Sequence, residues 1–260
     1  MMLWTTLAAE LRKAVSLPAV WAGLAVALLG STALTLLNAV TTRSAIDAGA
    51  LHRVADTSPV ETAFAAMPLG TVGAVIVGVV VVSSEYVTSD DGGGRQIAAT
   101  LAAVPRRAVV LAAKALTVAV LVLAVAAATI PVTVAVAVGI IGEGGVETVT
   151  VAEAATRGLG GALYWSLTGL IACAITVLTR SGTVPLLVLV VNSSLVSVSL
   201  LLTNVTELAH WLPDMAGRRL FGGDFTVDGG LDAVPGGLVM AGWTMALLVA
   251  AAVVFRRRDA

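Results

Sequence analysis

The sequence predicts an all-α integral membrane protein with six transmembrane helices, an N-terminal amphipathic helix at the membrane interface, and a short cytoplasmic helix between spans two and three. Mean hydropathy is +0.99, and 58% of the residues are hydrophobic while 12% are charged. Soluble domains carry roughly 25% charged residues, which supply a polar surface that this chain lacks. No segment between the apolar runs is long enough to fold separately, so residues 1–260 are expected to form a single transmembrane domain.

The six spans follow from length and from the absence of charge. A hydrocarbon core about 30 Å thick requires about 20 apolar helical residues. Stretches without Asp, Glu, Lys, Arg or His that meet this length cover approximately 19–40, 64–84, 115–141, 158–179, 183–203 and 234–255. Several are rich in Val, but they lack the alternation of a membrane barrel, and helices satisfy their own backbone hydrogen bonds in lipid.

The distribution of Lys and Arg predicts the orientation, because cytoplasmic loops of membrane proteins are enriched in both. One side of the predicted spans carries ten of the 15 cations: Arg12, Lys13, Arg95, Arg106, Arg107, Lys114, Arg180, Arg256, Arg257 and Arg258. The other side carries Arg43, Arg53, Arg157, Arg218 and Arg219. Both termini and segment 85–114 are therefore expected in the cytoplasm.

The first 17 residues are expected to form an interfacial helix rather than a cleaved secretory signal, with Pro18 at the turn into the first span. Apolar side chains recur at helical spacing, at Trp4, Leu7, Leu11 and Val15. The charged residues Glu10, Arg12 and Lys13 fall elsewhere on the helical wheel. The alternative is a frayed leader.

Segment 85–114 contains a short amphipathic helix that contributes nothing to spanning. Glu85 and Tyr86 end the second span, and a turn-rich Asp-Asp-Gly-Gly-Gly stretch (90–94) follows. From Arg95 onward one helical face carries Ile97, Leu101 and Val104, and Pro105 ends the helix. The basic residues Arg106, Arg107 and Lys114 would then meet anionic headgroups or acidic protein side chains; the alternative is that they only anchor the topology. No Gly-Lys-Ser/Thr follows the glycines, which excludes a P-loop.

The chain resembles the membrane permease subunits of bacterial, often actinobacterial, ATP-binding-cassette exporters of the type-2 superfamily. The matching motifs between spans two and three are Glu85-Tyr86, Thr100-Leu101, Val104-Pro105-Arg106-Arg107 and Lys114. The leader AAELRKAVSLPAVW (8–21) is similar to the family's start, and Trp211-Leu212-Pro213 with Ala216-Gly217 is similar to its external Leu-Pro segment. The stretch 90–94 departs from the family by being longer and more acidic.

This resemblance implies a transport subunit in the bacterial plasma membrane and not an enzyme. Segment 95–104 would act as a coupling helix seated on a separate ATP-binding-cassette ATPase subunit, which would bind ATP and Mg²⁺, while this chain binds no cofactor. A second copy of the chain or a homologue would complete the exporter, and membrane lipids would surround it. No nucleic-acid partner is expected.

The spans themselves carry few chemical signals. Asn192, Ser199 and Thr203 share roughly one stripe of the fifth predicted span, where they either line a substrate path or serve helix packing. No ionisable residue is expected deep in a span, which argues against a proton-coupled carrier.

Catalysis and metal binding have no support in the sequence. It has no His-Glu-x-x-His or Gly-x-Ser-x-Gly motif. His52 and His210 lack a ligand cluster, and the single Cys173 is expected to be a packed apolar residue. Two other functions stay open: a membrane scaffold or immunity-type protein that transports nothing, and a secondary transporter.

Overall fold

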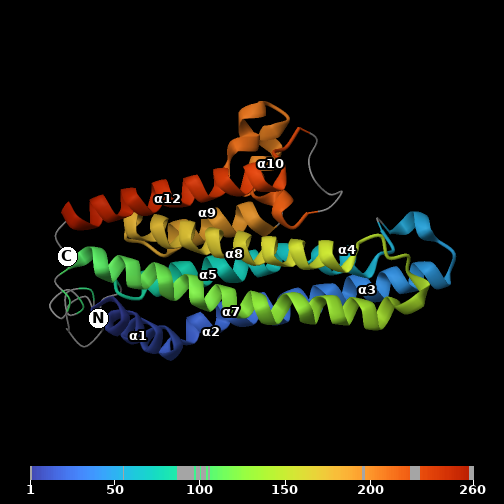
Figure 1. Cartoon of the computed structure of the whole chain (residues 1–260), viewed down its shortest axis with the longest axis horizontal. Coiled ribbons are helices and arrows are strands. Elements are labelled where there is room, and N and C mark those ends of the chain that lie inside the picture. Colours follow the sequence, from blue (N-terminus) through green and yellow to red (C-terminus); the bar gives the residue numbers. More distant parts are fainter. Residues whose placement is uncertain are drawn as a thin grey trace.

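The helices run side by side along the long axis of an elongated bundle (Figure 1). The computed structural model describes residues 2–54, 56–86, 97, 100, 104, 106–194, 197–222 and 229–257, and every regular element among them is a helix. Both termini lie at the same end of the bundle (Figure 1), which we call the termini end; the opposite end is the far end. Predicted site residues Arg95, Leu101 and Pro105, and stretch 90–94, lie outside the described residues.

Among the described residues, five helical segments are long and apolar enough to cross a membrane, which is consistent with the predicted all-α membrane class. They are 18–47, formed by α2 (Pro18–Ala25), the π-helical turn η1 (Val26–Gly30) and α3 (Ser31–Asp47); 59–83, formed by α4 (Pro59–Phe64) and α5 (Met67–Ser83); 107–144, formed by α7 (Arg107–Ile141) and the 3-10 turn η3 (Gly142–Gly144); α8 (Val151–Thr179); and α12 (Ala233–Arg257).

The predicted fifth span, 183–203, is not described as one helix. It comprises α9 (Thr183–Ser194) and the short α10 (Val198–Thr203). Twelve residues of α-helix extend about 18 Å, less than a hydrocarbon core. Beyond α10 the chain forms η4 (Glu207–Trp211), α11 (Pro213–Ala216) and η5 (Arg218–Leu220) before it enters α12. This connection projects from one side of the bundle (Figure 1).

The first helix, α1 (Met2–Ser16), forms as expected but buries a different face. Its contact with α7 buries Thr6, Leu7, Glu10 and Ala14, whereas Trp4 and Val15 are exposed. The apolar pattern therefore located the helix but not its packed face. The reason is that Glu10 has a cationic partner on α7, so burial of the carboxylate does not leave it unpaired.

Glycines on α5 set how closely its neighbours approach. A Cβ on Gly73 would lie 2.5 Å from the Gly23 carbonyl oxygen of α2, and one on Gly78 would lie 2.2 Å from the Gly169 carbonyl oxygen of α8. Small residues permit such backbone contacts between membrane helices. Gly70, one turn before Gly73 on α5, leaves space for the fully buried indole of Trp165. The Nε1 of this indole donates to the Met67 carbonyl oxygen at 3.2 Å.

Candidate functional site

Four charged side chains meet inside the bundle near the termini end. Lys114 of α7 lies with its Nζ 2.8 Å from Glu10 Oε2 of α1 and 3.0 Å from Glu85 Oε2, in the turn that follows α5. Lys13 of α1 also pairs with Glu85. Glu10, Glu85 and Lys114 are buried, and Lys13 is partly exposed. We call these four residues the ion cluster; it joins three segments that are distant in sequence.

The ion cluster also holds the segment between α5 and α7. Thr100 Oγ1 donates to Glu85 Oε1 at 3.0 Å, and the Ile97 backbone N–H donates to the Glu85 carbonyl oxygen at 3.3 Å. The Ile97 side chain is buried in the main hydrophobic core. Val104 N–H donates to the Thr100 carbonyl oxygen at 2.9 Å. Of these described residues, Ile97 and Thr100 are bonded directly to Glu85.

The electrostatics of Glu85 favour its ionised form. Burial by itself raises the pKa of this carboxyl, but the charge of Lys114 and the hydrogen bond and charge of Lys13 outweigh burial, and the pKa lies below 4.5. The neighbouring Tyr86 is half-buried, and burial raises the pKa of its phenol. At neutral pH the carboxylate is charged and the phenol is neutral.

The structure gives interior contacts to three of the residues expected to serve coupling or partner docking. Glu85, Ile97 and Lys114 are all buried within the chain. Lys114 was also expected at the membrane interface, but α7 begins at Arg107, eight residues before the predicted span. Its ammonium consequently lies on the third turn of the helix, against α1 and the Glu85 turn, where it neutralises two carboxylates.

Two predicted basic residues stay near the surface. Arg106 is exposed at the N-cap of α7. Arg107 is half-buried and donates from Nη1 to the Phe255 carbonyl oxygen at 2.9 Å, in the last turn of α12. A cation there satisfies a C-terminal carbonyl and opposes the helix dipole. Arg107 thus ties α7 to α12, and Arg106 is the more accessible of the two.

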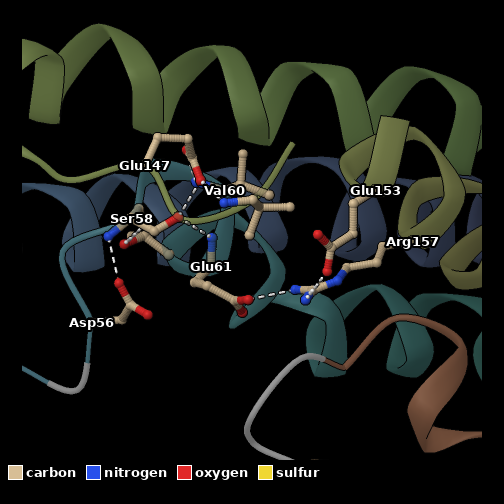
Figure 2. A network of polar contacts seen from close by, with 9 residues as sticks. Asp56, Ser58, Val60, Glu61, Glu147, Glu153 and Arg157 are labelled. Carbon is tan, nitrogen blue, oxygen red and sulfur yellow. Dashed lines mark hydrogen bonds and ion pairs between the residues drawn. The ribbon is translucent and has the colours of Figure 1, made fainter. Parts of the chain in front are cut away.

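A second polar network lies at the far end (Figure 2). Ser58 caps α4 by accepting from Glu61 N–H at 3.2 Å, and its Oγ donates to Glu147 Oε1 at 2.7 Å. Glu61 is buried and pairs with Arg157 of α8, which also bonds the exposed Glu153 at 2.7 Å. The network connects α4, α8 and the turn between α7 and α8.

A cavity of about 290 Å³ lies beside this network. Its lining includes Glu61 and Phe64 of α4, Tyr164 of α8, Asn192 of α9, Asp214 of α11 and Arg218 of η5. Two of the predicted pathway residues meet at this place: Asn192 Nδ2 donates to Asp214 Oδ2 at 2.9 Å, while Ser199 N–H donates to Asn192 Oδ1 at 3.3 Å. The third, Thr203, donates to the Leu200 carbonyl oxygen and does not line the cavity.

Sequence reasoning missed Glu10, Lys13, Glu61, Arg157 and Asp214 as interior partners. Glu10 and Lys114 lie 104 residues apart, and nothing in either local pattern links them. One feature of the sequence could have suggested this pair: Glu10 on the predicted interfacial helix and Lys114 at the start of a span are predicted on the same side of the membrane. Asp214 carries no such signal, because its carboxylate partners come from two separate elements, Asn192 on α9 and Ser197 at the start of α10.

The chain matches no protein-family model and no curated protein. Among the residues that the structure describes, no group of three or more His, Cys, Asp or Glu side chains is arranged to hold a metal ion. Cys173 is buried in the core, as expected. The candidate site is therefore defined by the ion cluster and the far-end cavity.

Proposed function

We propose that this chain is the permease subunit of an ATP-driven exporter of the ATP-binding-cassette type-2 kind, with the ATPase on a separate partner chain. Both termini and segment 85–114 lie in the cytoplasm of a bacterial cell, and α9 with α10 provides a sixth, shortened crossing. A second copy or a homologue completes the transporter. The motifs between 85 and 114 supply the resemblance on which this assignment rests.

The observation that carries the proposal is the attachment of Ile97 and Thr100 to the bundle through Glu85. A device that converts motion of a partner into motion of spans needs a rigid connection to more than one helix. Glu85 bonds Thr100 and Ile97 on one side and Lys13 and Lys114 on the other. Displacement of Ile97 and Thr100 would consequently act on α1, α5 and α7 together.

Arg106 is the contact that we assign to the ATPase, since it is exposed and lies next to the segment. Buried pairs such as Lys114 with Glu85 transmit the motion instead of touching the partner. Arg107 is unsuited to a direct test because its loss also removes the bond to Phe255.

The test is purification of the tagged chain from its native membrane, followed by identification of co-eluting proteins and assay of their ATPase activity. The proposal expects an ATP-binding-cassette ATPase whose turnover depends on this chain. Arg106→Glu should reduce its recovery, whereas Arg12→Glu, an exposed cation on α1, should not. Substrate transport driven by a proton gradient without ATP would establish a secondary transporter, and a stable complex without any ATPase would establish a scaffold.

A further inference from the structure

Two opposite charges border the far-end cavity without neutralising each other. Asp214 and Arg218 both line it, and neither forms an ion pair with any residue that the structure describes. The third charged lining residue, Glu61, forms an ion pair with Arg157. The cavity therefore presents one available carboxylate and one available guanidinium.

The two charged residues belong to different short elements, α11 and η5. On a continuous α-helix, residues i and i+4 lie on one face and an Asp and an Arg there can pair. Here α11 ends at Ala216 and the chain changes to a 3-10 turn at Arg218. Between them, Gly217 lets the chain pack closely on α8 and α12, because a Cβ on it would lie 2.3 Å from Met240 Sδ and 2.8 Å from Tyr164 Cδ2.

Neutral donors hold the carboxylate in position. Asp214 Oδ2 accepts from Asn192 Nδ2 at 2.9 Å and from Ser197 Oγ at 3.2 Å. Both donors are uncharged, so they orient the group and leave its charge uncompensated. A charge that is partly shielded from water and lacks a counter-ion is expensive to keep unless it serves a ligand.

Three aromatic side chains, Phe64, Tyr164 and Phe221, contribute to the remaining wall of the cavity, together with smaller residues such as Ala65 and Pro68. Phe64 and Tyr164 are buried, and Tyr164 meets Phe221 edge to face with ring centroids 4.9 Å apart. Such a wall binds an apolar or aromatic body, while a few placed polar groups fix its orientation. The volume of about 290 Å³ lies at the lower limit of ligand pockets, about 300–1,000 Å³, so the occupant is small.

We propose that this cavity binds a zwitterion attached to an apolar body, with its ammonium on Asp214 and its carboxylate or phosphate on Arg218. Guanidinium suits planar or tetrahedral oxyanions because it donates through two parallel N–H groups. Two sources share this chemistry: a free aromatic amino acid and the phosphoethanolamine headgroup of a membrane lipid. The inference goes beyond the proposed function, because binding requires neither ATP nor transport.

Calorimetric titration of the purified full chain in detergent, without any ATPase, tests this binding. The probes are phenylalanine, which carries both charges, and its single-charge analogues phenethylamine and 3-phenylpropionate. A parallel arm compares short-chain phosphatidylethanolamine with short-chain phosphatidylglycerol. In at least one arm, the zwitterion should bind at least about 10-fold more tightly than each comparison compound that lacks one of its two charged groups, since hydrogen bonds to charged groups are strong. The arm that responds identifies the source.

Variants assign the two charges. Asp214→Asn should weaken binding of the zwitterion by about 10-fold and leave the affinity for 3-phenylpropionate unchanged. Arg218→Gln should weaken binding of the zwitterion by a similar factor and leave the affinity for phenethylamine unchanged. Arg219→Gln is the matched control, since Arg219 pairs with the exposed Asp232 and does not line the cavity. Equal affinities for zwitterion and single-charge analogues, or no binding in either arm, would overturn the proposal. This comparison on the unaltered protein decides the question even where a variant fails to fold.

Discussion

Lys114 Nζ lies 2.8 Å from Glu10 Oε2, although 104 residues separate the two side chains. Both are buried, and the same ammonium lies 3.0 Å from Glu85 Oε2. A single cation thus joins α1, α7 and the turn after α5. Removing one partner of such a group leaves uncompensated charge in the interior, which makes the ion cluster sensitive to substitution.

Lys114→Met should strongly destabilise the protein. It leaves Glu10 without its cation and Glu85 with only Lys13, and breaking a buried pair from one side costs about 3–5 kcal/mol. Thermal unfolding in detergent measures the loss, with Arg106→Gln as a matched exposed control. The added change Glu10→Gln should recover part of the stability; a fully additive pair of losses would show that the two groups do not interact.

The pKa of Glu85 predicts a loss of stability in acid. Its folded pKa is lowered from 4.5, so the ionised carboxylate stabilises the fold fully above about pH 4.5, and this contribution disappears as the pH falls through the lowered folded value. Unfolding temperatures measured from pH 7 downward should fall below that point. In Glu85→Gln the fall should be shallower; an identical pH profile in the variant would assign the effect to other carboxyls.

Gly78→Ala should separate α5 from α8. The new Cβ would lie 2.2 Å from the Gly169 carbonyl oxygen, and a backbone atom cannot move aside as a side chain can. Overpacking of this kind costs about 1–3 kcal/mol. Gly139→Ala in α7 is the control, since no atom lies within 4 Å of its added Cβ, and it should be neutral or stabilising. Equal unfolding temperatures for both variants would refute the close contact.

The two ion pairs of Arg157, with Glu61 and with Glu153, should differ in how much they contribute to stability. Arg157→Gln leaves the buried Glu61 without a counter-ion, and a loss of about 3–5 kcal/mol is expected. Glu153→Gln removes an exposed i, i+4 pair instead, worth about 0.3–0.5 kcal/mol. Thermal unfolding of the two variants side by side distinguishes a structural role for Glu61 from a surface role.

The helical membrane class and most of the long helices could be predicted from the amino-acid sequence alone. Long uncharged apolar runs can satisfy their backbone only as helices in lipid, so composition and run length suffice for this conclusion. The clustering of cations near one set of helix ends agrees with the observed chain path, in which both termini lie at one end (Figure 1). The motif set at 85–114 supplied the functional hypothesis, which stays a prediction.

The polar contacts between elements could not be predicted from the sequence. Apolar periodicity placed Glu10 away from the packed face of α1, but a partner on α7 made its burial favourable. Likewise, the sequence did not distinguish Lys114 from an interfacial anchor; the structure does, because α7 begins at Arg107 and places Lys114 within the helix. Asn192 bonds Asp214, and Ser199 bonds Asn192, because short elements after α9 bring these residues together. Pairing across elements depends on long-range packing, which leaves no trace in local spacing.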